Sequence, residues 1–132
     1  MQVLFVEDDA MNRKVVRDML SVVGAAMDEA PDAETGLRMI DEGAYDLVLM
    51  DLRMPGMDGL TAIRHLRDRL DLKRELPVIV VTADTAVDLR ERCLEGGADD
   101  VILKPVAMSL LLKTMSRMLT QGWSASPRRH AA

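Results

Sequence analysis

Five polar residues of the chain stand at the ends of four short apolar runs. Glu7 and Asp8 follow VLFV (3–6), Asp51 follows LVLM (47–50), Thr82 follows VIVV (78–81) and Lys104 follows VIL (101–103). Carboxylate oxygens bind hard cations such as Mg²⁺, while a hydroxyl and an ammonium are donors that can hold a phosphoryl group. A carboxylate can also accept that group itself and form an aspartyl-phosphate. These residue types therefore point to phosphoryl chemistry if the fold brings them together.

The apolar runs predict strands that are buried on both faces. They are rich in β-branched residues and show no polar alternation, which is typical of a parallel sheet covered by helices. A weaker fifth strand is expected near 25–29. Helical spacing of apolar residues predicts helices at 11–23, 33–42, 60–69, 86–94 and 107–119. The chain is therefore expected to repeat a strand and a helix five times.

The predicted fold class is α/β, a single doubly wound (βα)5 flavodoxin-like domain with five helices around a five-stranded parallel sheet. Its expected strand order is 2-1-3-4-5, which makes the first and third strands neighbours. Because the carboxyl ends of parallel strands meet at one edge, Glu7, Asp8 and Asp51 should share a cleft with Thr82 and Lys104. Carboxylates at such short distances repel each other, which favours the binding of a cation. Mg²⁺ suits a site that has oxygen ligands and no His or Cys.

Simpler structural roles exist for each of these residues taken singly. Lys104 and Asp51 would form an ordinary ion pair, Thr82 would be a strand-end hydroxyl, and Asp8 and Asp9 would cap the first helix. A shared site explains better why all of them fall on the same edge of one sheet.

Three further aspartates stand at positions that favour structural roles. Asp58 is expected to cap the third helix, and Asp99 and Asp100 are expected to lie in a solvated turn.

The order and spacing of these residues resemble the receiver domain of two-component response regulators. The resemblance covers residues 2 to 119 and rests on VEDD, LVLMDLRMPGMDG, VVTA and GADDVILKP. It implies a magnesium site formed by Glu7, Asp8, Asp51 and the backbone carbonyl of Arg53. It implies catalytic roles for Asp51 as the phosphorylated aspartate, for Thr82 as the switch hydroxyl and for Lys104, with Ala83 as a cofactor-binding residue. The Lys104–Pro105 peptide bond is expected to be cis, and Asp9 to cap the first helix.

The chain departs from the family pattern at two places. The position three residues before the lysine, usually Tyr or Phe, is Val101, so the usual aromatic readout of phosphorylation is not expected to operate. The last helix, VAMSLLLKTMSRML, is unusually apolar, and at least one of Leu110, Leu111 and Leu112 should be exposed.

The leading functional hypothesis is a signalling module that takes a phosphoryl group from a phosphohistidine onto Asp51. The donor would be a histidine kinase or a histidine phosphotransfer protein, and phosphorylation would change which partner is bound. One alternative is a phosphatase that turns over an aspartyl-phosphate, although such enzymes carry a second acid where Arg53 stands. Another is an adaptor that acts without phosphorylation. A stand-alone regulator and the receiver of a hybrid histidine kinase are both compatible with the sequence.

Composition limits the other classes. The 132 residues fit one domain, expected at 1–120, followed by a polar tail at 121–132. The formal net charge of -5, without a basic cluster before the last residues, argues against nucleic-acid binding. The single Cys93, the absence of a signal-like start and the lack of a membrane-length apolar run favour a cytoplasmic protein, with no membrane contact. It is expected to be a monomer or a weak dimer.

Two surface features are predicted from spacing. In the first helix Val16, Met19, Leu20 and Val23 should face the sheet, leaving Met11, Val15 and Val22 near water. Met11 and Val15 lie close to the acidic pair and could dock the helix that bears a donor histidine. Arg53 and Asp84, each two residues beyond a site residue, are expected to face each other above the phosphoryl group.

Overall fold

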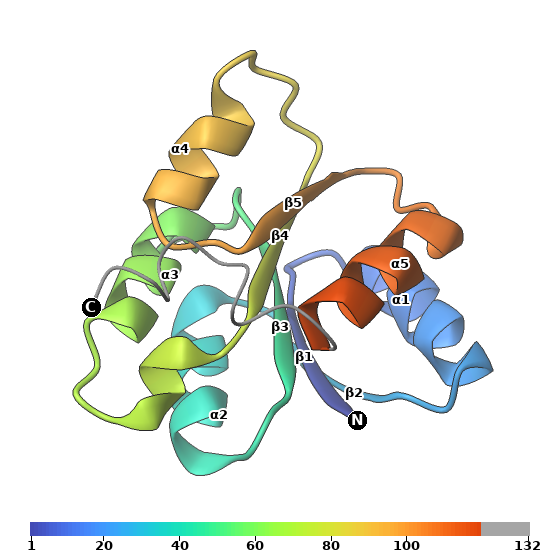
Figure 1. Cartoon of the computed structure of the whole chain (residues 1–132), viewed down its shortest axis with the longest axis horizontal. Coiled ribbons are helices and arrows are strands. Elements are labelled where there is room, and N and C mark those ends of the chain that lie inside the picture. Colours follow the sequence, from blue (N-terminus) through green and yellow to red (C-terminus); the bar gives the residue numbers. More distant parts are fainter. Residues whose placement is uncertain (120–132) are drawn as a thin grey trace.

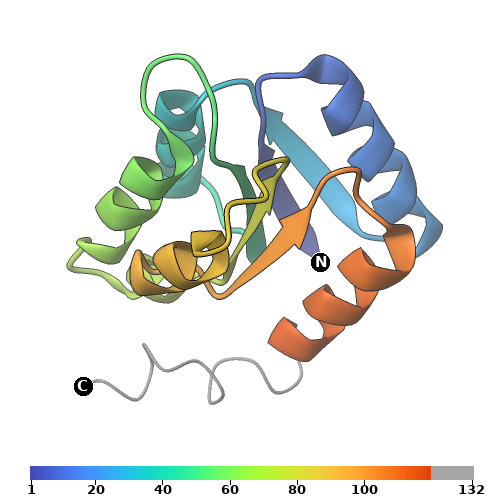
Figure 2. The same ribbon diagram turned by 90° about the horizontal axis from the view of Figure 1, so that it is seen from above.

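The computed structural model describes residues 1–119, and it confirms the predicted fold class. Five parallel strands lie in the order β2-β1-β3-β4-β5, and helices cover both faces of the sheet (Figures 1 and 2). Helices α1 and α5 pack on one face and α2, α3 and α4 on the other. The predicted tail at 121–132 lies outside the described residues. Within 1–119, no helix is long and apolar enough to cross a membrane.

The strands are short, and the central ones carry the most apolar sequence. They span Gln2–Val6 (β1), Ala26–Ala30 (β2), Leu47–Asp51 (β3), Val78–Thr82 (β4) and Asp100–Leu103 (β5). All residues of β3 and β4 are buried, as expected for runs without polar alternation. In the register of the sheet, Val6 lies beside Ala30 on one side and Met50 on the other. The ends of β1 and β3 are therefore adjacent.

The helices begin largely where their capping residues predict. They span Ala10–Val22 (α1), Ala33–Glu42 (α2), Gly59–Arg67 (α3), Leu89–Glu95 (α4) and Met108–Arg117 (α5), with a 3₁₀ turn at Leu72–Glu75 (η1). The side chains of Asp9, Asp32 and Asp58 accept hydrogen bonds from backbone N–H groups of the first turns of α1, α2 and α3. This confirms the predicted caps at Asp9 and Asp58.

Helix α4 begins three residues later than predicted. The Asp84 carboxylate accepts a hydrogen bond from the backbone N–H of Ala86 at 2.9 Å, which turns the chain before the helix starts. Residues 83–88 thus form a loop at the carboxyl edge of the sheet instead of the first turn of a helix.

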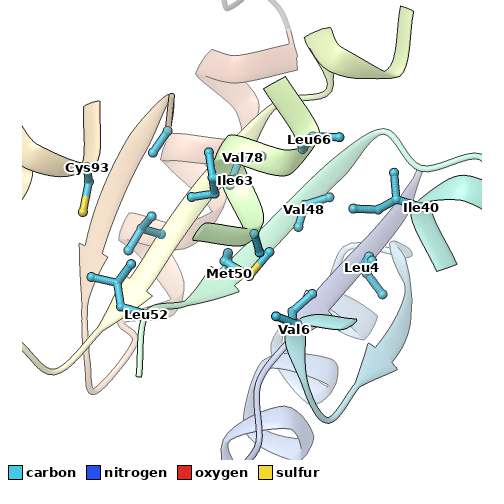
Figure 3. Packing of buried hydrophobic residues seen from close by; sticks show 14 of the residues in the cluster. Leu4, Val6, Ile40, Val48, Met50, Leu52, Ile63, Leu66, Val78 and Cys93 are labelled. Atoms are coloured by element: carbon cyan, nitrogen blue, oxygen red, sulfur yellow. The ribbon is translucent and has the colours of Figure 1, made fainter. Parts of the chain in front are cut away.

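Two hydrophobic clusters hold the layers together. The cluster under α2, α3 and α4 includes Val6, Met50, Ile63 and Cys93 (Figure 3). The cluster under α1 and α5 includes the buried Leu20 and other aliphatic side chains. Because the strands are rigidly packed on both faces, the polar residues at their ends have fixed directions.

The predicted inner face of α1 is correct except at its last residue. Val16 and Leu20 are buried and Met19 is half-buried, but Val23 is 54% exposed. Val23 lies beyond the end of α1, just before Gly24, whose φ of 74° turns the chain away.

In α5 the prediction that part of the Leu110–Leu112 run is exposed is confirmed. Leu111 is fully buried, whereas Leu110 is 48% exposed.

The interpretation of Asp99 and Asp100 as a solvated turn is wrong. The Asp99 side chain is 3% exposed and accepts hydrogen bonds from the backbone N–H of Val78 at 2.9 Å and from Arg67 Nη2 at 3.1 Å. Asp100 is the first residue of β5 and pairs with Arg90 of α4 and Arg117 of α5. These buried carboxylates therefore connect the start of β5 to neighbouring elements through ion pairs with Arg67, Arg90 and Arg117.

Candidate functional site

Three carboxylates converge at the carboxyl edge of the sheet. Glu7 and Asp8 follow β1, Asp51 ends β3, and one oxygen from each lies within 4.8 Å of the others. Glu7 is 1% exposed and Asp51 4% exposed, while Asp8 is open to solvent. The cluster thus has a buried inner side and an open outer side.

Lys104 reaches into the same cluster from the end of β5. Its Nζ lies 2.6 Å from Glu7 Oε1 and 3.4 Å from Asp51 Oδ1, so it bridges two acids instead of pairing with Asp51 alone. Burial acts to lower the pKa of Lys104, but its hydrogen bond to Glu7 and the negative charges outweigh this and hold the pKa above its ordinary value. The ammonium is therefore charged at neutral pH. The Lys104–Pro105 peptide bond is cis, as predicted.

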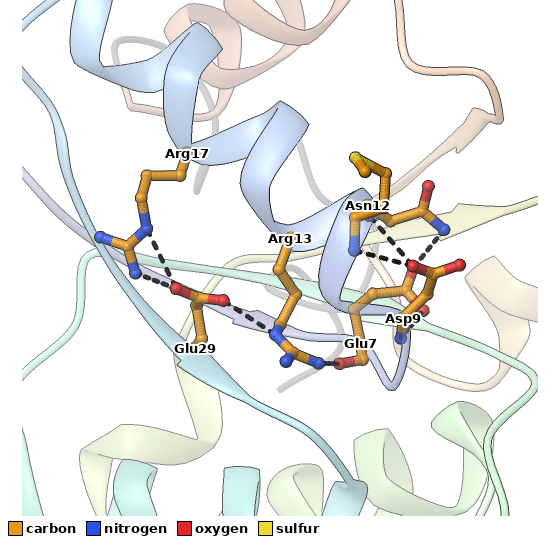
Figure 4. A network of polar contacts seen from close by, with 7 residues as sticks. Glu7, Asp9, Asn12, Arg13, Arg17 and Glu29 are labelled. Carbon is orange, nitrogen blue, oxygen red and sulfur yellow. Dashed lines mark hydrogen bonds and ion pairs between the residues drawn. The ribbon is translucent and has the colours of Figure 1, made fainter.

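Glu7 is held by more partners than the other two acids. Besides Lys104, its carboxylate accepts hydrogen bonds from Asn12 Nδ2 at 3.4 Å and from the backbone N–H of Asp9 at 3.3 Å (Figure 4). Glu7 therefore sets the position of Lys104, which leaves Asp8 and Asp51 with the freer oxygens.

The donor set fits a magnesium ion. The three side chains of the cluster offer carboxylate oxygens, which Mg²⁺ prefers, and one oxygen from each lies within 4.8 Å of the others. The three carboxylates and one ammonium carry a formal charge of -2, so a divalent cation would neutralise the cluster.

Thr82 is the last residue of β4 and is 1% exposed. Its Oγ1 accepts a hydrogen bond from the backbone N–H of Asp84 at 3.1 Å, which leaves the hydroxyl proton available as a donor. The next residue, Ala83, is exposed at the start of the loop before α4.

Val101, in the position where the family usually carries an aromatic residue, is half-buried. It lines a cavity of about 260 Å³ together with Leu103 and residues of the 84–90 segment.

Arg53 and Asp84 do face each other. Arg53 Nη2 lies 2.7 Å from Asp84 Oδ2, with the arginine side chain 79% exposed and the aspartate side chain 16% exposed. The hydrogen bond from Arg53, helped by the backbone N–H of Ala86, lowers the pKa of Asp84 below its usual range. The pair thus joins the loop after β3 to the loop after β4, beside Asp51.

We predict that breaking this pair shortens the lifetime of a phosphoryl group on Asp51. The double substitution Arg53→Ala and Asp84→Ala opens the way for an attacking water, and we expect the half-life to fall by roughly tenfold, the effect of a modest change in positioning. The half-life is measured by following the loss of radioactive phosphate after the donor is removed. An unchanged half-life would leave the two residues as surface charges only.

Gly59 packs directly against the backbone of Asp51, a contact that was not predicted from the sequence. A Cβ atom built on Gly59 would lie 2.1 Å from the backbone oxygen of Asp51. The Gly59 N–H donates to the carbonyl of Leu52 at 2.9 Å, so α3 begins in direct contact with the end of β3. The expected cap at Asp58 predicts that a helix starts here, but only the close backbone approach explains why the next residue is glycine.

Residues 3–116 match the response regulator receiver domain family. The chain is 35% identical over 116 residues to the sensor histidine kinase RcsC of Salmonella typhimurium and 38% identical over 119 residues to the response regulator MprA of Mycobacterium avium. These alignments cover 88% and 90% of this chain but 12% and 51% of the two relatives. The chain therefore spans about half or less of the length of these curated relatives.

Two solved receiver domains of histidine kinases share the fold. One is that of the sensor histidine kinase PA1611 from Pseudomonas aeruginosa PAO1, which has a magnesium ion coordinated in its active site cleft; the TM-score is 0.80 at 33% identity, over 88% of this chain and 94% of that one. The other is the signal receiver domain of a signal transduction histidine kinase from Syntrophus aciditrophicus, with a TM-score of 0.82 at 31% identity, over 91% and 90% of the chains. Together with the family match, these likenesses show that the chain belongs to the response regulator receiver domains of two-component signalling.

Proposed function

We propose that Asp51 accepts a phosphoryl group from a phosphohistidine of a histidine kinase or phosphotransfer protein, in a reaction that needs Mg²⁺. The observation that carries this proposal is the position of Asp51, which lies between two further carboxylates and the Lys104 ammonium at the edge of the sheet. The magnesium bound to the receiver domain of PA1611 supports the same cofactor here.

Each group of the site has a distinct task in the proposed transfer. A carboxylate oxygen of Asp51 attacks phosphorus, the P–N bond of the phosphohistidine breaks, and its electron pair stays on the imidazole nitrogen. Lys104 donates to the phosphoryl oxygens, and Thr82 and the backbone N–H of Ala83 complete the donor set.

A bound cation would balance the negative charge of the carboxylates and of the phosphoryl group. Glu7, Asp8, Asp51 and the Arg53 carbonyl would hold Mg²⁺, which neutralises charge on the phosphoryl oxygens. The charge of -2 on the cluster without a cation would otherwise repel an anionic donor.

The test uses acetyl phosphate, which needs no protein interface. We expect incubation with acetyl phosphate and Mg²⁺ to raise the mass of the protein by one phosphoryl group, and a chelator to prevent it. Rapid, repeated turnover without a stable adduct would identify a phosphatase, and no reaction at all would favour an adaptor that acts without phosphorylation.

We predict that Asp8→Asn raises the Mg²⁺ concentration needed for half-maximal labelling. Asp8 is the exposed acid of the cluster, so its replacement removes a ligand charge without opening a buried cavity. The expected increase is on the order of tenfold, as for groups that tune metal affinity. Labelling rates measured across a Mg²⁺ series give the value. The same Mg²⁺ dependence as wild type would contradict the assignment of Asp8 to the metal.

A further inference from the structure

The backbone carbonyl of Glu7, just after the last paired residue of β1, is held by the side chain of Arg13. The register of β1 with β2 ends at Val6 and Ala30, and the N–H of Glu7 donates to the carbonyl of Ala30 at 2.9 Å. The carbonyl of Glu7 accepts a hydrogen bond from Arg13 Nη1 at 2.7 Å (Figure 4). A guanidinium from α1 thus holds the first peptide of the loop that bears the acidic pair.

Arg13 is itself held in place by Glu29 on the neighbouring strand β2. Arg13 Nε lies 2.8 Å from Glu29 Oε1, and the other oxygen of Glu29 accepts a hydrogen bond from Arg17 Nε at 3.0 Å. The hydrogen bond from Arg17, with a smaller contribution from Arg13, outweighs burial and lowers the pKa of Glu29. Glu29 therefore stays ionised, and the Arg13 side chain, 17% exposed, is clamped between two acceptors.

We propose that Arg13 is a positioning residue for the magnesium site, and this inference rests on the proposed function. By fixing the Glu7 carbonyl it sets the direction in which the chain leaves β1, and hence where the carboxylates of Glu7 and Asp8 point. The planar fork of a guanidinium suits this role because two of its nitrogens meet two acceptors at once. Partners that orient ligands in this way contribute strongly to metal affinity.

An electrostatic role and a positioning role of Arg13 predict opposite changes in Mg²⁺ affinity when Arg13 is replaced. Removing a positive charge close to an acidic cluster should strengthen the binding of a cation by Coulomb attraction alone. Loss of the bond to the Glu7 carbonyl should weaken binding, because the ligands must then be ordered when the ion binds. The sign of the change therefore distinguishes a positioning role from an electrostatic one.

Arg17 supplies a matched control. It lies one helical turn after Arg13, pairs with the same Glu29, and carries the same charge, but the structure gives it no bond to Glu7. Arg13→Met and Arg17→Met change the net charge equally and keep an unbranched side chain of similar length. Only the first removes the bond to the Glu7 backbone.

The experiment is isothermal titration of wild type and both variants with MgCl₂. We expect Arg13→Met to bind Mg²⁺ about tenfold more weakly and Arg17→Met to bind as tightly as wild type or slightly more tightly. Binding by Arg13→Met that equals or exceeds wild type overturns the proposal. If wild type does not bind Mg²⁺, the proposed function fails and this inference fails with it, whereas binding by wild type with an unaffected Arg13→Met refutes this inference alone.

A second variant covers the case in which Arg13→Met does not fold. Arg13→Lys keeps the charge but replaces the fork by a single ammonium, and we expect weaker Mg²⁺ binding with little change in the thermal unfolding temperature without Mg²⁺. A merely structural role predicts the reverse, a lower unfolding temperature with unchanged Mg²⁺ affinity, and that result would also refute the proposal.

Discussion

Asp51→Asn reduces phosphoryl labelling by at least about a thousandfold, because the amide that replaces the carboxylate is not a nucleophile. Asp51 is 4% exposed and lies near two other acids, so the substitution keeps the shape of the side chain and removes a repelling charge. We therefore expect the thermal unfolding temperature to stay the same or rise while labelling is lost. Intact-mass measurement after incubation with acetyl phosphate, paired with a thermal melt, reports both quantities.

Asp58→Asn is the matched control for this loss. Asp58 caps α3 through its Oδ1, and asparagine caps a helix about as well as aspartate. The same chemical change at position 58 should leave labelling intact.

Lys104→Ala tests the division of labour within the site. It should still bind Mg²⁺, because the three carboxylates remain, but it should be labelled slowly.

If Asp51→Asn is labelled as fast as wild type, the acceptor has been assigned to the wrong residue.

A second large effect is expected on the surface of α1. Met11 is 66% exposed and Val15 is 41% exposed, and their spacing of four residues places them on one face of the helix, close in sequence to the acidic pair. A helix that bears the donor histidine can pack on this face and present its phosphoryl group to Asp51. Changing both residues to Asp should slow transfer from a phosphorylated histidine protein about a hundredfold, tenfold for each lost apolar contact. Labelling by acetyl phosphate should be unchanged.

The last residue of α1 and the residue that follows it provide the control for docking. Val22 and Val23 are 69% and 54% exposed but lie away from the acidic pair, so changing both to Asp should leave transfer from either donor unaffected. Equal slowing of the Met11 and Val15 variant with both donors would indicate damage to the site or the fold. Normal transfer from the histidine protein would exclude this surface from docking.

The sequence predicted which residues lie at the carboxyl edge of the sheet, because local signals and topology sufficed for that. Asp51 and Thr82 end their strands, and the acidic pair and Lys104 follow theirs. A parallel sheet must bring such ends to one edge. The caps at Asp9 and Asp58 were predictable for the same reason, since a cap acts within three residues of its own position.

Ion pairs between distant elements were not predictable. Asp99 bonds to Arg67, 32 residues away, and Arg13 bonds to Glu29, 16 residues away. In the sequence these residues look like any other charged residues on a solvated helix or turn. Which residue becomes the ion-pair partner depends on how the elements pack and not on the spacing in the sequence. The hydrogen bond from Arg13 to the Glu7 carbonyl is even harder to predict, because every residue has a backbone carbonyl and the acceptor therefore has no characteristic residue type.

The contact between Gly59 and Asp51 has an evolutionary consequence. Any side chain at position 59 would push against the backbone of β3, whether or not Asp51 is ever phosphorylated. Selection for folding alone therefore keeps the glycine, whereas, on the proposed function, selection for signalling keeps the aspartate. In a lineage that abandons phosphorylation, residue 51 should drift first and Gly59 should persist. A glycine retained beside a lost acceptor would mark such a descendant as a former receiver.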